Sequence, residues 1–163
     1  MGCWSCATGS AGACRRRGAL RVCARVADIA SRIPGARVEA TLSGEVLVVP
    51  PAEWRSACEH IALTGMELSD LTLIDRAETL DVVAHVFDSP AECLQLRTSL
   101  PPDTPRVASV TNVWPSADWL EREAAEMFGV TFLDHPDPRR LLLTDDFEGA
   151  PLRKAFLCEE SSW

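Results

Sequence analysis

The pattern of hydrophobic and polar positions over residues 24–49 predicts a short helix followed by a hairpin. The helix is expected to cover residues 24–32, because a Pro-Gly pair follows and cannot continue it. Apolar and polar side chains then alternate over residues 38–42, and residues 46–49 are apolar. A Ser-Gly pair between these two runs is typical of a tight turn, so they are expected to pair as an antiparallel hairpin.

A longer helix is predicted to begin near Pro51 and to end at Gly65. Its apolar positions recur at the i, i+3, i+4 and i+7 spacing that places side chains on one helical face. A glycine after the last of them favours the left-handed conformation that ends many helices. The apolar face comprises Trp54, Ala57, Cys58 and Ile61.

Three further strands are predicted over residues 68–75, 80–87 and 93–98, where apolar residues alternate with polar ones. The connections, residues 76–79 and 88–91, are too short for a helical crossover, so neighbouring strands are expected to pair antiparallel. The predicted fold class is therefore α+β, with two layers in which helices pack on an antiparallel or mixed sheet.

We expect three regions along the chain. Residues 1–25 contain four Cys and five Arg without hydrophobic periodicity, and we interpret them as a disordered leader or a wrongly assigned start. Residues 26–105 are expected to form the α+β domain, which ends in a Pro-rich stretch. Residues 106–163 are expected to contain a helix and an extended C-terminal docking segment.

The most sharply bounded helix is predicted over residues 117–128, between Ser116 as the N-cap and Gly129 as the C-terminal stop. At 100° per residue its apolar side chains form one stripe along the helix. The stripe comprises Ala117, Leu120, Ala124, Met127 and Phe128.

The charged residues of this helix are expected in two kinds of position. Arg122 lies opposite the apolar stripe, where it is predicted to pair with Asp118 and Glu126 at four-residue spacing. Glu121 and Glu123 fall on the two edges of the stripe, so both are expected to be partly buried. A buried carboxylate is costly unless a donor meets it. Basic residues that follow are candidate donors, within this chain or toward another protein: His135, Arg139, Arg140, Arg153 and Lys154.

Composition is that of an ordinary folded domain, with 47% hydrophobic and 25% charged residues. The net charge is -8, and residues 26–163 contain 11 basic against 24 acidic residues. Such an acidic body argues against nucleic-acid binding, which needs clustered positive charge. No apolar run approaches the roughly 20 residues of a membrane-spanning helix.

The odd number of Cys, seven, argues against a secreted disulfide scaffold. Cys58 and Cys93 lie in apolar patterns, where a free thiol acts as a small hydrophobic side chain in a reducing compartment. The leader suggests another reading, an N-terminal Cys metal-binding protein with thiolate ligands. Its candidate ligands are Cys3, Cys6, Cys14 and Cys23, of which only the first two have a common ligand spacing.

A hydrolase with paired carboxylates is a further alternative, built on Glu121 and Glu123 around His135 or on the acidic cluster at residues 145–148. Residues two apart on a helix diverge by about 200°, so the two glutamates cannot flank one substrate bond. The acidic cluster precedes a Gly-Ala-Pro turn and is expected to be a solvated loop.

Several blocks of fixed spacing occur in one order along the chain: Asp70-Leu-Thr, Ser109-Val-Thr-Asn-Val-Trp-Pro-Ser-Ala-Asp-Trp, Glu121-Arg-Glu-Ala-Ala-Glu-Met-Phe-Gly, His135-Pro-Asp-Pro-Arg-Arg-Leu-Leu-Leu and Glu148-Gly-Ala-Pro-Leu-Arg-Lys. They closely resemble the C subunit of NADH-quinone oxidoreductase, the 30 kDa subunit family of respiratory complex I. The resemblance extends over residues 26–157 and is strongest from Ser109 onward. The leader has no expected counterpart in the family.

The resemblance implies a subunit of the peripheral arm with no cofactor and no catalytic site of its own. NADH, flavin, iron-sulfur clusters and quinone would belong to partner subunits. The implied partners are other complex I subunits, chiefly the one that forms the quinone pocket, on the cytoplasmic side of the inner membrane. The equivalent subunit of an energy-converting membrane hydrogenase or a related dehydrogenase is the alternative.

Carried over residue by residue, the resemblance implies an interface or structural role for a set of charged positions, which we call the signature residues. They are Glu121, Arg122, Glu123, Glu126, His135, Arg139, Arg140, Arg153 and Lys154.

Overall fold

The computed structural model describes residues 26–41, 44–89 and 92–157. The leader, with the candidate metal ligands Cys3, Cys6, Cys14 and Cys23, lies outside the described residues. Residues 26–32 are helical. The other elements are β1 (Arg37–Thr41), β2 (Gly44–Val48), the 3-10 turn η1 (Pro51–Glu53), α2 (Trp54–Ala62), β3 (Glu67–Asp75), β4 (Leu80–Ser89), β5 (Glu92–Leu100), β6 (Arg106–Ala108), α3 (Ala117–Phe128) and β7 (Thr131–Leu133).

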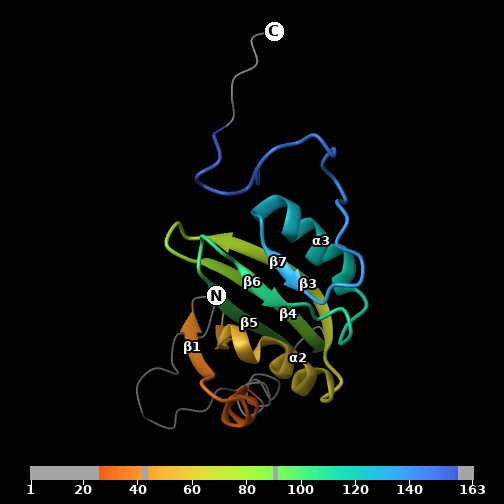
Figure 1. The fold of residues 1–163 in the computed structure, drawn as a ribbon. Coiled ribbons are helices and arrows are strands. Elements are labelled where there is room, and N and C mark those ends of the chain that lie inside the picture. The colour runs from red at the N-terminus through yellow and green to blue at the C-terminus, as the bar shows by residue number, and fades with distance from the viewer. Residues whose placement is uncertain (1–25, 42–43, 90–91, 158–163) are drawn as a thin grey trace.

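Five strands form one mixed sheet in the order β1-β2-β5-β4-β3 (Figure 1). Strands β3, β4 and β5 pair antiparallel, as their short connections predict. Strands β1 and β2 form the predicted hairpin. Strand β2 pairs parallel with β5, an arrangement that the long connection through α2, β3 and β4 permits. The predicted α+β class is confirmed, with the sheet mixed rather than antiparallel.

The hydrophobic core lies against one face of this sheet. Leu47, Val82 and Leu96 come from three different strands, and each side chain is 0% exposed. Helix α2 covers them with the apolar face that its spacing predicts, Trp54, Ala57, Cys58 and Ile61. Burying such a set of side chains is the main favourable contribution to folding, about 25 cal/mol for each Å² of apolar surface removed from water.

The two cysteines within the described residues occupy different environments. Cys58 is buried, as predicted, and burial raises the pKa of its thiol well above the ordinary value, with the charge of Glu121 acting in the same direction. Cys93 is exposed, although it lies in an apolar stretch of the sequence. Its neighbour Leu94 points to the core, and successive side chains of a strand point to opposite faces.

A second, smaller sheet consists of β6 and β7, which pair parallel with Arg106 opposite Thr131. Neither strand was predicted, since each is only three residues long. Helix α3 is the crossover between them and packs against β3. Leu100 and Val107 belong to one core cluster, although they lie on either side of the domain boundary expected at residue 105. That boundary stays a prediction.

Candidate partner-docking site

Helix α3 begins at Ala117 and ends at Phe128, as predicted. Gly129 has the left-handed φ of 70°, and its N–H donates to the Ala125 carbonyl at 2.8 Å. The predicted capping role of Ser116 is wrong, because its backbone is helical and its hydroxyl makes no capping hydrogen bond. The apolar stripe is confirmed: Ala117, Ala124 and Phe128 are buried, and Leu120 and Met127 pack partly buried against the core.

Glu121 is the most deeply buried charged group of this helix, with 0% of its side chain exposed. Its Oε1 accepts a hydrogen bond from the N–H of Val110 at 2.7 Å, and its Oε2 lies 3.9 Å from Nε2 of His135. Burial raises the pKa of Glu121, while hydrogen bonds from Val110 and Ser109 and the charges of His135 and Arg55 lower it. The expected burial is confirmed, and the donors come from this chain.

His135 connects the start of α3 to the chain that follows β7. Its side chain is 3% exposed, and its Nδ1 accepts a hydrogen bond from the N–H of Asp137 at 3.0 Å. A neutral ring must therefore carry its proton on Nε2. That atom lies 3.2 Å from the carbonyl oxygen of Asp118 and 3.5 Å from the Asp118 carboxylate. The ring is thus held in one orientation beside Glu121.

Glu123 does not share the environment of Glu121. The structure places it in the exposed class, so the prediction that it is partly buried is wrong. The edge of the stripe on which it lies is open, because Trp119, one turn earlier, is 67% exposed. The two glutamates therefore lie in different surroundings and do not form a catalytic pair.

Arg55 of α2 binds the chain both before and after α3 in the sequence. Its Nε donates to the Ser109 carbonyl at 3.0 Å, and its Nη2 donates to the Leu133 carbonyl at 3.2 Å and to the Asp134 carboxylate at 3.1 Å. Ser109 directly follows β6, and Leu133 and Asp134 lie at the end of β7, so one guanidinium joins the ends of both short strands. Sequence reasoning missed this residue.

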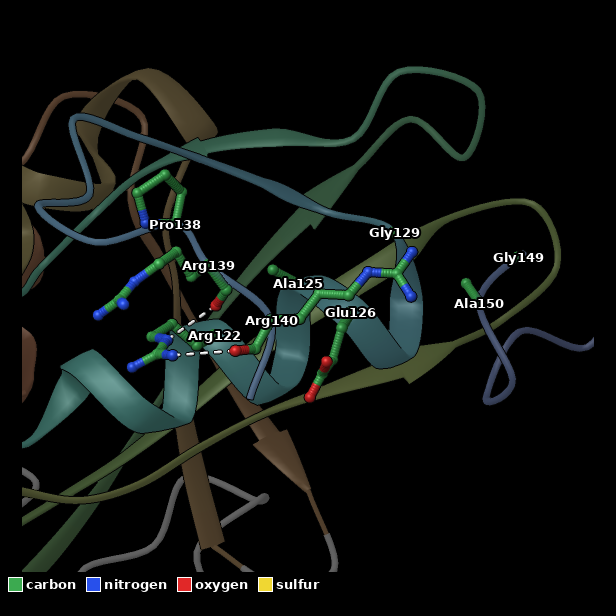
Figure 2. Close-up of a pocket in the computed structure, with 9 residues that line it drawn as sticks. All are labelled: Arg122, Ala125, Glu126, Gly129, Pro138, Arg139, Arg140, Gly149 and Ala150. Atoms are coloured by element: carbon green, nitrogen blue, oxygen red, sulfur yellow. Dashed lines mark hydrogen bonds between the residues drawn. The ribbon is translucent and has the colours of Figure 1, made fainter. Parts of the chain in front are cut away.

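The chain after β7 crosses α3 without forming a helix or strand, and we call residues 134–157 the C-terminal segment (Figure 1). Arg122 holds it by donating from Nε to the Arg139 carbonyl at 2.9 Å and from Nη2 to the Arg140 carbonyl at 3.0 Å (Figure 2). The Glu126 carboxylate accepts the backbone N–H groups of Leu141, Leu142 and Leu143. The predicted pairing of Arg122 with Asp118 and Glu126 is therefore wrong, because the C-terminal segment binds Arg122 and Glu126 instead.

A second anchor holds the far end of the C-terminal segment to the end of β3. The Asp75 carboxylate accepts hydrogen bonds from the N–H of Lys154 at 2.9 Å and of Ala77 at 2.7 Å, and lies 3.2 Å from Nε of Arg153. The Lys154 backbone hydrogen bond is the main reason why the pKa of Asp75 is lowered, followed by that of Ala77. Arg153 also donates to the carbonyls of Phe128 and Pro102.

A cavity of about 430 Å³ lies between α3 and the C-terminal segment (Figure 2). Its charged lining consists of Arg122, Glu126, Arg139 and Arg140. The rest of the lining is small or rigid: Ala125, Gly129, Pro138, Gly149 and Ala150. Three Arg and one Glu therefore line the cavity among residues with little bulk.

The remaining signature residues lie at the surface of the C-terminal segment. Arg139 is 80% exposed in its side chain and forms a two-pronged ion pair with Asp137, which lowers the pKa of Asp137 to about 2. Arg140 donates from Nη1 to the carbonyls of Thr144 and Phe147. Lys154 is exposed, as is the acidic cluster at residues 145, 146 and 148. The cluster is thus a solvated loop, as predicted.

The structure brings most signature residues together around α3. Three further side chains make hydrogen bonds or ion pairs there, although the sequence did not single them out. They are Arg55, Asp75 and Asp137. Asp137 had a weak signal, because it lies between His135 and Arg139 in the motif. Arg55 and Asp75 bind groups up to 79 positions away along the chain, so no local pattern indicates them.

Residues 26–41, 44–89 and 92–157 contain no group of three or more His, Cys, Asp or Glu side chains arranged to hold a metal ion. None of the helices in these ranges is both long and apolar enough to cross a membrane.

Comparison with known families identifies the chain. The model of the family described as respiratory-chain NADH dehydrogenase, 30 Kd subunit, matches residues 47–162, which include α3, the cavity and the C-terminal segment. The chain belongs to this family. The C subunit of NADH-quinone oxidoreductase from Caulobacter vibrioides is 40% identical over 142 residues, which cover 79% of this chain and 70% of that protein. The resemblance seen in the sequence blocks is confirmed.

Solved structures agree with membership of the 30 kDa subunit family. A trypsin-resistant fragment of Nqo5, residues 1–134, is 28% identical with a TM-score of 0.63, over 71% of this chain and 98% of the fragment. A chain of an archaeal membrane-bound sulfane sulfur reductase is 20% identical with a TM-score of 0.60, over 76% of each chain. The second similarity shows a shared fold alone.

We predict that Glu121→Ala lowers the free energy of unfolding by about 2–4 kcal/mol, because it leaves a cavity and an unpaired buried N–H on Val110. Glu121→Gln keeps an acceptor for that N–H and should cost about 1 kcal/mol or less at neutral pH. Urea unfolding of both variants and the wild type measures these losses. Equal losses in the two variants would contradict the assigned hydrogen bond.

The same variants test the ionisation of Glu121. Because its pKa is raised above 4.5 in the folded state, the wild type should lose stability relative to Glu121→Gln as the pH rises from 4.5 toward the raised pKa. The loss arises because the unfolded chain releases the proton first. If the stability of the wild type increased relative to Glu121→Gln over this range, burial would not be the main influence on the pKa of Glu121.

We predict that Asp75→Asn loosens the end of the C-terminal segment, because it removes the negative charge beside Arg153. Trypsin should then cleave after Arg153 and Lys154 faster than in the wild type, since proteolysis favours loosely held chain. Asp145→Asn, on the exposed loop, is the matched control. Time-resolved mass spectrometry of the fragments measures the rates, and equal rates in all three proteins would contradict the anchor.

Proposed function

We propose that this chain is a non-catalytic docking subunit in the peripheral arm of a proton-translocating NADH-quinone oxidoreductase, where it supports assembly beside the subunit that forms the quinone pocket. Membership of the 30 kDa family and the 40% identity to the Caulobacter protein support this choice of complex. In this proposal NADH, flavin, iron-sulfur clusters and quinone bind to partner subunits. The chain attaches to the cytoplasmic side of the inner membrane through those partners.

The arrangement of side chains on α3 and the C-terminal segment carries the proposal. The segment is held through polar contacts, whereas Leu142 is 60% and Leu152 55% exposed. Trp119 of α3 is 67% exposed, and Glu123 lies four residues later on the same side of the helix. We call Trp119, Glu123, Leu142 and Leu152 the docking surface. Exposed large apolar side chains among polar groups are typical of protein interfaces, and Trp is enriched at their energetic centres.

The signature residues divide into two groups under this proposal. One group anchors the C-terminal segment or the start of α3 from inside: Glu121, Arg122, Glu126, His135 and Arg153. The other is open to a neighbouring protein: Glu123, Arg139, Arg140 and Lys154. The first group thus holds α3 and the C-terminal segment in position. The second group and the exposed apolar side chains are then available to contact a neighbouring protein.

The alternative is the equivalent subunit of an energy-converting membrane hydrogenase or a related complex. The fold shared with a chain of the archaeal sulfane sulfur reductase complex favours it, since the same scaffold occurs in a complex with a different activity. The docking surface would serve the same purpose in that setting, and only the neighbouring subunits would differ.

Affinity purification of the tagged chain from its native membranes in mild detergent tests the proposal. The expected result is recovery with the quinone-pocket subunit and further subunits of NADH-quinone oxidoreductase, identified by mass spectrometry. Recovery with hydrogenase or sulfur-reductase subunits would support the alternative. Recovery of the intact chain without any oxidoreductase subunit would overturn both.

Glu123→Ala provides the mutant arm of this experiment. Because Glu123 is exposed, its loss should change the free energy of unfolding by no more than about 0.5 kcal/mol. Its loss from the docking surface should weaken association by about 1 kcal/mol, roughly five-fold in affinity. Glu59→Ala, an exposed glutamate on α2, is the matched control and should leave the yield of complex unchanged. Equal yields for both variants would exclude Glu123 from the interface.

A further inference from the structure

The cavity between α3 and the C-terminal segment is a basic site in an acidic chain. It is lined by three Arg and one Glu, whereas residues 26–163 contain 11 basic and 24 acidic residues. Local positive charge of this kind attracts negatively charged groups and repels other positively charged ones. The cavity therefore differs in charge from the body that surrounds it.

The internal contacts compensate the charges of the three Arg side chains to different degrees. Arg122 and Arg140 donate mainly to backbone carbonyls, which are neutral acceptors. Asp137 pairs directly with Arg139, and its Oδ2 lies 3.6 Å from Nη1 of Arg122. The Glu126 carboxylate is already occupied by three backbone N–H groups. The charge of Arg140 helps to lower the pKa of Asp146, but Arg140 is exposed and donates its hydrogen bonds to neutral carbonyls. It is thus the guanidinium best placed to bind an additional carboxylate.

Small residues keep the cavity open. Gly129 and Gly149 have positive φ values of 70° and 92°, which side chains rarely adopt. A Cβ atom on Gly149 would also lie 3.0 Å from the Phe156 ring. The volume of about 430 Å³ falls within the roughly 300–1,000 Å³ of pockets that hold ligands. The site has room for an acidic side chain and the residues next to it.

We propose that this cavity receives an Asp or Glu side chain from a loop of the neighbouring subunit, bound chiefly by Arg140. The inference rests on the proposed docking function and adds the chemistry of the partner. A guanidinium recognises a carboxylate through two parallel hydrogen bonds, which supply direction as well as charge. Arg122 and Arg139 contribute positive potential from the cavity lining, and the paired Asp137 limits that of Arg139.

Site-specific photocrosslinking in the assembled complex tests this inference. Pro138 is exposed and lines the cavity, so a photoreactive amino acid in its place reports what enters. The same group in place of Glu59 on α2 is the control. The expected product joins Pro138 to a partner peptide that contains Asp or Glu within two residues of the crosslink, and this product should be absent from the control.

The outcomes separate the two proposals. An intact complex in which the crosslink falls on a lipid, on this chain itself or on a partner peptide without an acidic residue would overturn the acidic-loop inference and leave the docking function standing. Failure of the unmodified tagged chain to recover any oxidoreductase partner would overturn the docking function itself.

Variants of Arg140 test the role of its charge and distinguish it from a purely structural role. Arg140→Gln should lower the affinity of the chain for the complex roughly ten-fold, which corresponds to about 1.4 kcal/mol, because it removes the charge that pairs with the partner's carboxylate. Arg140→Lys keeps the charge and should recover part of this loss. Both variants shorten the side chain that holds the Thr144 and Phe147 carbonyls, so a structural role predicts equal losses. Equal losses, or none, in salt-wash dissociation assays would overturn the inference.

Discussion

The hydrogen bond from the Val110 N–H to the Glu121 carboxylate is the constraint on which the rest of the site depends. A carboxyl group with no exposed surface is costly unless a donor meets it. Here the N–H of Val110, in the loop after β6, donates to Oε1, while Nε2 of His135, after β7, lies 3.9 Å from Oε2. Arg55 binds backbone carbonyls of the same two stretches, so the chain before α3 and the chain after it are joined by polar groups in addition to the packing of the apolar stripe. The position of the helix then determines where Arg122 and Glu126 meet the C-terminal segment.

The C-terminal segment shows how a chain without regular hydrogen-bonded structure is held in place. Arg122 satisfies its carbonyls, Glu126 satisfies its N–H groups, and Asp75 holds its far end. Backbone groups that would otherwise need a strand or helix partner are thus paired with charged side chains. The segment is free to turn Leu142 and Leu152 outward, and this combination of fixed backbone and exposed apolar side chains is what a docking surface requires.

Much of the fold was predictable because its signals are local. Gly129 marks the end of α3, and the helical spacing from Trp54 to Ile61 identifies the buried face of α2. The parallel pairing of β2 with β5 was not predictable, since it depends on how distant strands meet. Strands of three residues, such as β6 and β7, are too short to show a periodic pattern.

The site was predictable only in part, for a related reason. Helical periodicity predicted partial burial for Glu121 and Glu123 at the two edges of the stripe. It failed for Glu123, because the edge on which Glu123 lies is open and Trp119 on the same edge is exposed. Pairing rules within one helix assigned Arg122 to Asp118 and Glu126. They could not include the C-terminal segment, whose carbonyls that accept from Arg122 lie 17 and 18 positions further along the chain. The sequence blocks identified the family, whereas the contacts required the three-dimensional arrangement.

A structure of the native complex purified through this chain is the most direct measurement of the central claim. Trp119, Glu123, Leu142 and Leu152 should be covered by another subunit, while α3 and the C-terminal segment keep the hydrogen bonds of Glu121, Arg122 and Glu126. A complex in which this surface faces solvent, and the chain is attached through another part of its fold, would contradict its assignment as the docking surface.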